Sequence, residues 1–284
     1  MRRYNPTRRN RNIGTEKRGH GRDNRLTIPK VRHGENAYWE RLDDAREVRR
    51  SISGSILQFF VERTRADCVH ACTVDDIALL MSRIPAKDWE GLGAIVLRQP
   101  RRKEQALAPI WGRLCYSADL VNRHRQVIYS GPAIVIEAVD PNQEVSFGKS
   151  LSVDAAAELE RLRSDGHQIV TAHRDHRVRS TLENCRATQL YRTLLHELGH
   201  WVDFLERVER PAALAGLDAY EELLTRFHRR PQREKEQFAH SWASESSKRL
   251  LTAKLIPFDR QMNRTQLLED GLNEEDFTAG DSGA

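Results

Sequence analysis

The amino-acid sequence predicts an α+β fold in which a small mixed β-sheet is followed by two long helices. Short apolar runs typical of strands gather between residues 92 and 139, and helical periodicity dominates after residue 184. Strands in one part of a chain and helices in another are typical of this class. A chain of 284 residues, 39% of them hydrophobic and 31% charged, can enclose one sizeable core.

Residues 1–33 are predicted to form a basic disordered tail. The stretch up to Arg32 contains eleven Arg and Lys against two acids and shows almost no apolar periodicity. The rest of the chain is therefore mildly acidic. Such a tail could contact the phosphates of a nucleic acid, although no aromatic residues alternate with its basic ones as stacking requires. A solvated tail without a partner is the alternative.

Residues 34–84 are predicted to form a helical N-terminal segment. Between residues 36 and 66, apolar side chains recur at intervals of three and four, as they do on one face of a helix. They are Trp39, Leu42, Ala45, Val48, Ile52 and Ile56. A further helix is expected after Thr73, because Thr73-Val74-Asp75-Asp76 has the form of a capped helix start.

Residues 85–256 are predicted to form the main domain, and residues 257–284 an acidic C-terminal tail. The main domain is expected to contain strands at 92–98, 110–117 and 132–139, a helix at 152–164, an extended run at 168–178, and helices at 184–208 and 233–255. The tail is predicted from composition, since residues 265–284 include six acids and three glycines.

The composition also indicates a compartment. No apolar run follows the basic start as it would in a secretory signal, and no run is long enough to span a bilayer. The four cysteines, Cys68, Cys72, Cys115 and Cys185, are few and scattered, which is typical of a reducing compartment. A cytoplasmic protein that does not enter membranes is expected, with leaderless export as an effector as the alternative.

The segment His196-Glu197-Leu198-Gly199-His200 fits the pattern His-Glu-x-x-His. Residues four apart lie on one face of a helix, so both imidazoles can bind one ion. A catalytic zinc ion has three protein ligands and an open position for water, and Glu197 can take a proton from that water. The sequence therefore predicts a Zn²⁺ site with His196 and His200 as ligands and Glu197 as the general base.

The residues around this segment favour a metal site over two ordinary core histidines. Its neighbours Leu194, Leu195, Trp201 and Val202 are uncharged, unlike those of a surface helix. Imidazoles and a carboxylate buried in such a helix would be costly without a partner.

A third ligand is expected from a carboxylate farther along the chain. The candidates are Glu206, Glu221 or Glu222, and Glu236. Glu236 is favoured, because Ala239 and Ala243 share its helix face and would allow that helix to approach the metal helix closely. Asp203 is expected either to orient one of the imidazoles or to be an exposed acid at a helix end.

These two segments together resemble a known family. The pairing of His196-Glu197-Leu198-Gly199-His200 with Glu236-Gln237-Phe238-Ala239 resembles the gluzincin-like peptidases, in particular the catalytic domain of the anthrax lethal factor family and small phage, plasmid and toxin metallopeptidases. The resemblance implies a zincin-like fold, in which one helix carries His-Glu-x-x-His and a later helix carries Glu-x-Phe-Ala. It also implies that His196, His200 and Glu236 bind zinc and that Glu197 is the general base.

One departure from the family concerns the donor that stabilises the oxyanion. Relatives of lethal factor carry a tyrosine a few residues before the third ligand, where this chain has Arg229 beside His228. His228, Tyr220 or His240 could take that role. His240, one turn after Glu236, is favoured as the second catalytic residue.

The expected function is that of a zinc-dependent endopeptidase acting on a protein or peptide substrate, which could pair with an exposed strand edge at 168–178. The alternatives are a DNA-associated regulatory or repair peptidase that uses the basic tail, a catalytically silent zincin-fold binding module, and an effector with one narrow target.

Other chemical signals are predicted to be structural. Cys68-Val69-His70-Ala71-Cys72 has no second pair at zinc-finger spacing, so its thiols are expected to be buried near a helix or turn. His173 and His176 are expected at exposed positions. No glycine-rich phosphate loop is present, so no nucleotide cofactor is expected.

Overall fold

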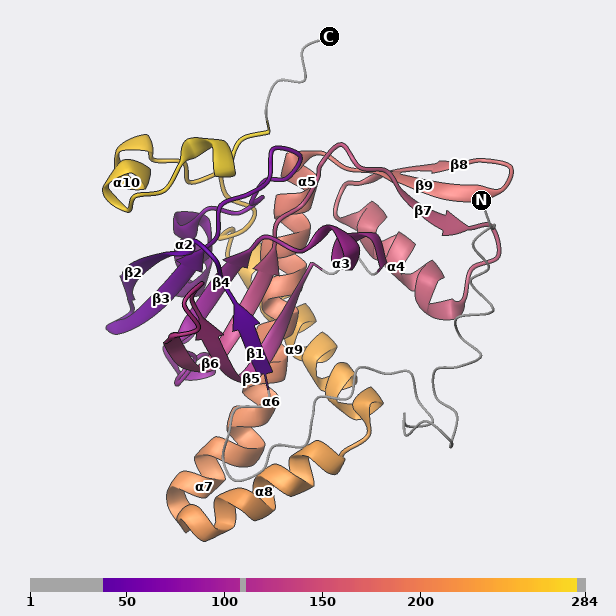
Figure 1. Ribbon diagram of the computed structural model, residues 1–284. Coiled ribbons are helices and arrows are strands. Elements are labelled where there is room, and N and C mark those ends of the chain that lie inside the picture. Colours follow the sequence, from indigo (N-terminus) through magenta and orange to yellow (C-terminus); the bar gives the residue numbers. More distant parts are fainter. Residues whose placement is uncertain (1–37, 108–110, 280–284) are drawn as a thin grey trace, which may run out of the picture. The chain divides into compact units, whose positions relative to one another are not determined.

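A mixed six-stranded β-sheet forms the centre of the computed structural model, which describes residues 38–107 and 111–279 (Figure 1). The strands lie in the order β1-β5-β6-β4-β3-β2. Their bounds are Tyr38–Arg41 for β1, Arg46–Ile52 for β2, Ser55–Val61 for β3, Ala94–Arg98 for β4, Gly112–Val121 for β5 and Val127–Glu137 for β6. Helices pack with this sheet in one unit, so the predicted α+β class is confirmed. The tail predicted for residues 1–33 lies outside the described residues.

The middle of the sheet is built from the strands that the sequence predicts most directly. All five residues of β4 are buried, and β4 runs parallel to both β3 and β6. A continuous apolar run is typical of a strand covered on both faces. The strands expected at 92–98, 110–117 and 132–139 are confirmed within the described residues, with β5 and β6 extending as an antiparallel pair.

The helix predicted between residues 36 and 66 is wrong, because this stretch forms β1 and the antiparallel hairpin of β2 and β3. Val48 and Ile52 are both buried on β2, and a spacing of four fits a strand face as well as a helix face. The deciding feature is the turn at Ser53 and Gly54, whose φ angles of 51° and 85° are those of a two-residue hairpin loop.

Helix α2 (Val74–Ser82) begins where the capping pattern predicts. The Asp76 N–H donates to the Thr73 hydroxyl, and the Thr73 N–H donates to the Asp76 carboxylate. The separate N-terminal segment predicted for 34–84 is not seen, because β2 and β3 belong to the same sheet as β4.

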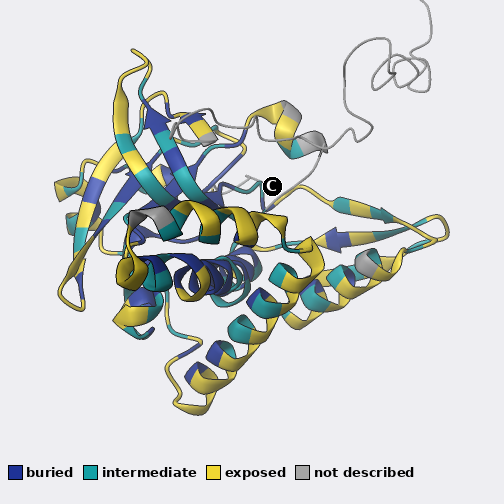
Figure 2. Cartoon of the chain, turned by 90° about the horizontal axis from the view of Figure 1, so that it is seen from below, coloured by how far each residue is buried: buried dark blue, intermediate teal, exposed yellow. Residues whose placement is uncertain are grey.

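A continuous helical stretch from residue 182 to 215 includes the predicted metal helix. Its parts are α5 (Leu182–Ala187), a π-helical segment (Thr188–Leu194), α6 (Leu195–Phe204), a second π-helical segment (Leu205–Glu209) and α7 (Arg210–Ala215). Figure 2, seen from below, shows the largely buried α6 nearly end-on in the centre, with more exposed helices around it. The helix predicted at 184–208 is confirmed and is longer than expected. π-Helical turns are rare and often occur next to functional sites.

Two further helices follow. Helix α8 (Leu217–Arg229) is not among the predicted helices, although Leu223, Leu224 and Phe227 mark an apolar face at helical spacing. Helix α9 (Gln232–Thr252) confirms the helix predicted at 233–255. The connection between α8 and α9 is Arg230-Pro231, both in extended conformation.

A smaller three-stranded sheet lies between β6 and α5 in the described sequence, in the order β7 (Val145–Gly148), β9 (Asp175–Arg179), β8 (Gln168–Thr171). Helix α4 (Val153–Ser164), capped by the Ser152 hydroxyl, packs with it around Leu159, Leu162 and Val178. The predicted helix at 152–164 is confirmed. The run expected to extend from 168 to 178 instead folds as a hairpin of β8 and β9.

The acidic C-terminal tail predicted for 257–284 is wrong for the described residues up to 279. They include α10 (Arg264–Glu269) and a short 3₁₀ turn at Glu274–Asp276, and they bury Leu267, Leu272 and Phe277. These apolar positions, spaced by five, join the main core between the acids. The segment is therefore packed against the core through these apolar residues, and its acidic composition does not make it a loose tail.

None of the helices in the described residues is both long enough and apolar enough to cross a bilayer.

Candidate metal centre

Helix α6 places His196 and His200 on one face, as the four-residue spacing predicts. Their ring centroids are 4.6 Å apart, and their Nε2 atoms are 3.1 Å apart. The opposite face of the helix is anchored in the core by Leu195, Leu198 and Trp201, all buried. This packing leaves the two imidazoles little freedom to turn away from each other.

Glu236 on α9 completes the group. Its Oε2 lies 3.2 Å from His196 Nε2 and 3.5 Å from His200 Nε2. Its other oxygen accepts a hydrogen bond of 2.6 Å from the Gln232 side chain, one turn earlier on the same helix. One oxygen is therefore held by α9 itself, and the other faces the histidines.

The spacing of the three atoms fits a metal ion. Ligands about 2.0–2.1 Å from a tetrahedral ion lie about 3.3 Å from one another. The three measured separations of 3.1, 3.2 and 3.5 Å lie around this value. Two imidazole nitrogens and one carboxylate oxygen are also a donor set used by catalytic zinc sites, with a fourth position open. Within the described residues, no other group of His, Cys, Asp and Glu comes together in this way.

A close contact between α6 and α9 makes the group possible. A Cβ atom at Gly199 would lie only 2.7 Å from the carbonyl oxygen of Ala239 and 2.9 Å from its Cα. Of the residues other than glycine, none could occupy position 199 without moving the Ala239 backbone. The predicted close approach of the two helices is therefore seen at Ala239; the role of the small side chains of Ala239 and Ala243 in it stays a prediction.

Glu197 is the neighbour of His196 in the sequence, and its side chain is hydrogen-bonded to the central sheet. Its Oε2 accepts a hydrogen bond of 2.7 Å from the Leu114 N–H on β5. Burial raises the pKa of this carboxyl, and the neighbouring His196 and His200 act in the opposite direction. A base whose pKa lies above the ordinary glutamate value is better suited to pass on the proton it accepts.

His240 lies one turn after Glu236 and packs against His196, with ring centroids 4.4 Å apart. Its side chain is exposed. Burial of part of the ring and the nearby His196 lower its pKa. The structure therefore brings His240 to the edge of the centre, where a neutral imidazole can donate a hydrogen bond.

Asp203 does not orient an imidazole, contrary to one expectation. Its side chain is 1% exposed and its two oxygens pair with Arg207 Nε and Arg230 Nη1, each at 2.6 Å. The buried Nδ1 of His196 has no hydrogen-bond partner among the described residues. Asp203 is thus neither an exposed acid nor a partner of the histidines.

The other candidate ligands lie outside the group. The side chains of Glu206, Glu221 and Glu222 are exposed, and Glu222 pairs with Arg226. The Tyr220 hydroxyl donates to Glu209 at 3.3 Å.

Sequence reasoning missed Tyr116 on β5, two residues after the contact to Glu197. Its ring packs against Phe204 at 4.8 Å, Phe227 at 5.5 Å and His228 at 6.3 Å. Burial, with the nearby carboxylates of Asp203, Glu197 and Glu236, raises the pKa of its hydroxyl, which stays protonated. The sequence predicts only that Tyr116 lies in a strand. Its position near the centre depends on how that strand packs against α6, which no local pattern shows.

The expected strand edge at 168–178 belongs to the smaller sheet, with β8 on its edge and β9 in the middle. The strand that contacts α6 is β5, through Leu114. Cys68 and Cys72 are buried free thiols just before α2, as expected, and His70 is buried with them.

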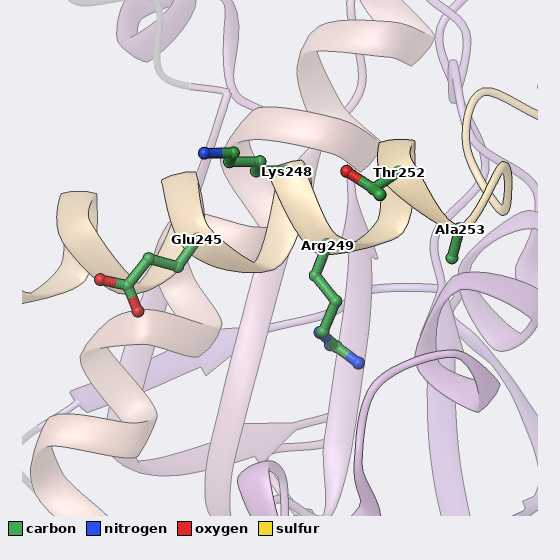
Figure 3. Close-up of a pocket in the computed structure, with 5 residues that line it drawn as sticks. All are labelled: Glu245, Lys248, Arg249, Thr252 and Ala253. Atoms are coloured by element: carbon green, nitrogen blue, oxygen red, sulfur yellow. The ribbon is translucent and has the colours of Figure 1, made fainter.

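A surface depression on the second half of α9 is separate from this centre. It is lined by Glu245, Lys248, Arg249, Thr252 and Ala253 (Figure 3). All five residues come from α9 and the turn that ends it, and none belongs to the histidine group.

Searches against protein-family models, curated proteins and solved structures found no match for this chain.

Proposed function

We propose that this chain is a zinc-dependent endopeptidase of the zincin type, which hydrolyses a peptide bond in a protein or peptide substrate. The observation that carries the proposal is the convergence of His196, His200 and Glu236 at tetrahedral ligand spacing, with Glu197 adjacent. The two-histidine, one-carboxylate set favours zinc over the hard cations, which prefer oxygen ligands only.

A bound zinc ion would supply Lewis acidity, polarising a peptide carbonyl and acidifying water in the open coordination position. The remaining chemistry belongs to the chain. Glu197 accepts the proton from the attacking water and then donates it to the leaving amine. The Leu114 N–H holds one oxygen of Glu197, so the carboxylate keeps its direction between these two steps.

Attack on the carbonyl carbon places a negative charge on the former carbonyl oxygen, which needs a hydrogen-bond donor. Among the described residues, His240 and Tyr116 are the donors that we propose for this role. His240 packs against His196 from α9, and Tyr116 lies on β5, two residues after the Leu114 N–H that bonds Glu197. A substrate chain lying between these two elements would meet both.

The test is the zinc content of the purified protein and of four variants, measured by elemental analysis after dialysis. We expect one zinc per chain, lost in His196→Ala and Glu236→Ala and kept in Glu206→Ala and Glu197→Gln. Glu206 is the matched control for Glu236, because it is an exposed glutamate on the neighbouring helical stretch.

Turnover is measured on denatured casein and on a mixed peptide library. The Glu197→Gln variant is expected to lose at least about 10³-fold in rate while retaining zinc. Zinc binding without any turnover in the wild type would favour the silent binding module instead. No zinc in the reconstituted wild type would contradict the proposal.

A further inference from the structure

The three ligand atoms come from two helices that are distant in sequence. His196 and His200 lie on α6, whereas Glu236 lies on α9, with α7 and α8 between them. Neither helix alone brings the three atoms together. The contacts that hold α9 against α6 therefore decide whether Glu236 reaches the histidines.

The first contact is the approach of Gly199 to Ala239, three residues after Glu236. It sets how closely the helices lie at this point, and farther along α9 the side chains of Ala243 and Leu250 pack into the main core. All of these α9 residues lie on the C-terminal side of Glu236. A second contact on its N-terminal side would keep the start of α9, and with it the Glu236 carboxylate, from moving relative to the histidines.

That second contact is the ion pair of Asp203 and Arg230. Arg230 Nη1 lies 2.6 Å from Asp203 Oδ2, and the two side chains are 16% and 1% exposed. Asp203 follows His200 by three residues on α6, and Arg230 precedes Glu236 by six. The pair therefore joins the helix of the histidines to the start of α9.

The local structure around Arg230 suits an anchor. Arg230 has an extended backbone (φ −62°, ψ 144°) in the short link between α8 and α9, and its N–H ends α8 by donating a hydrogen bond of 3.2 Å to the Phe227 carbonyl. Its guanidinium also lies 5.7 Å from the Phe227 ring centroid and 3.7 Å from Glu234. These neighbours align the side chain with Asp203.

Arg207 provides a natural comparison. It pairs with the other oxygen of Asp203, also at 2.6 Å, but its side chain is 50% exposed and it belongs to the same continuous helical stretch as Asp203. It offers Asp203 a positive charge without touching α9.

We propose that Arg230, through its buried ion pair with Asp203, is a positioning residue that holds Glu236 at the metal site. The inference rests on the proposed function, since it assumes that His196, His200 and Glu236 bind a metal. Asp203 acts on the third ligand through Arg230 and does not touch the metal or its histidines.

The experiment compares zinc affinity, by competition with a chromophoric chelator, in the full-length wild type, Arg230→Gln and Arg207→Gln. Each variant removes one positive partner of Asp203. We expect Arg230→Gln to weaken zinc binding about 10–100-fold, as loss of a residue that orients a ligand does. Arg207→Gln should change it by less than about threefold, because an exposed pair contributes little.

A double-mutant cycle separates positioning from a general loss of stability. The Glu236→Ala variant keeps both histidines, so weak zinc binding that dialysis removes is still measurable by competition at high zinc concentration. In this background Arg230→Gln should cause no further loss of zinc affinity, because the ligand that it positions is gone. The cobalt-substituted protein gives a second readout: its visible absorption should weaken in Arg230→Gln and stay unchanged in Arg207→Gln. If Arg230→Gln does not fold, Arg230→Lys and Arg207→Lys replace the pair, and the same order of affinities is expected.

Equal zinc affinities in the two arginine variants would overturn the positioning role while leaving the metal site intact. Additive losses in the Glu236→Ala background would do the same. A wild type that binds no zinc would instead refute the metal site itself, and the positioning role with it, so the two failures are distinguishable.

Discussion

The pKa values of Glu197 and Glu236 are shifted in opposite directions, because the two carboxyls near His196 and His200 have different surroundings. Hydrogen bonds from His196 and His200 hold the pKa of Glu236 well below its usual range. Burial raises the pKa of Glu197, whose carboxylate is held by a backbone N–H. A carboxylate that stays ionised suits a metal ligand, and one with a raised pKa suits proton transfer.

Tyr116 is expected to matter for turnover but not for metal binding. Burial and the nearby carboxylates raise the pKa of its hydroxyl, so the hydroxyl stays neutral and can donate a hydrogen bond to the oxyanion. We expect Tyr116→Phe to lower kcat at least about 10-fold with zinc content unchanged. Tyr220→Phe is the control, because the Tyr220 hydroxyl bonds Glu209 instead.

His240→Ala, measured in the same assay, tests the donor predicted from the sequence. Its ring is exposed and packs on His196, so a smaller loss of kcat than in Tyr116→Phe is expected. A larger loss would identify His240 as the main donor.

Glu62, away from the metal centre, is expected to make stability depend on pH. Burial raises its pKa from 4.5 to about 7, against hydrogen bonds from the Gln99 and Asp43 N–H groups. The unfolded chain loses this proton at lower pH than the native chain does. Between the two pKa values the native state binds more protons, so its stability falls as pH rises.

The measurement is the free energy of unfolding of the wild type and of Glu62→Gln, by denaturant titration at several pH values. The wild-type value relative to the variant should fall by about 1–3 kcal/mol between about pH 5 and pH 8. A flat difference would show that folding leaves the pKa of Glu62 unchanged, and a difference that grows with pH would show that folding lowers it; either result would contradict the prediction.

The candidate site depends on the close packing of α6 against α9, because the histidines lie on one helix and Glu236 on the other. Gly199 sits within the helix, where alanine would ordinarily be favoured by about 1 kcal/mol. The close approach of the Ala239 backbone reverses that preference, since a methyl group at position 199 would overlap it.

The Gly199→Ala variant is therefore expected to be less stable than the wild type by about 1–3 kcal/mol, and to bind zinc more weakly because α9 must move. Thermal unfolding and zinc competition check the two effects. An increase in stability, as helix propensity alone predicts, would mean that the helices are not in close contact in solution.

At the scale of the whole described unit, the C-terminal segment returns to the N-terminal hairpin. Asp270 pairs with Arg50 on β2, and the Asp276 carboxylate accepts a hydrogen bond of 2.8 Å from the Thr64 N–H. Phe277 is fully buried in the main core. The two ends of the described chain thus stabilise each other.

Two neighbouring leucines on α10 allow a test of whether the C-terminal segment is packed against the rest of the described chain. Leu267 is 5% exposed and Leu268 is 77% exposed. We expect Leu267→Ala to lower the free energy of unfolding by about 2–4 kcal/mol, and Leu268→Ala by less than about 0.5 kcal/mol. Similar small effects for both would mean that residues 257–279 behave as the loose tail that composition alone predicts.

Much of the fold could be predicted because several signals are local. The capping box at Thr73 and Asp76, the apolar run of β4 and the long helical patterns are each set by residues that are neighbours in sequence. The hairpin of β2 and β3 was missed because Val48 and Ile52 fit two periodicities at once. The C-terminal segment was missed because a charged composition hides a few well-placed apolar residues.

The sequence by itself determined the pair of histidines and the adjacent Glu197, because four-residue spacing on a helix fixes their relative positions without help from the rest of the chain. It indicated Glu236 through the small residues of its helix and through the resemblance of its Glu-x-Phe-Ala segment to the gluzincin-like peptidases. The tertiary structure alone decided the partners of Asp203, the contact of Leu114 with Glu197 and the presence of Tyr116 beside the centre. Each of these contacts joins segments that are far apart in the chain. Such contacts depend on how helices and strands pack, which no local sequence pattern encodes.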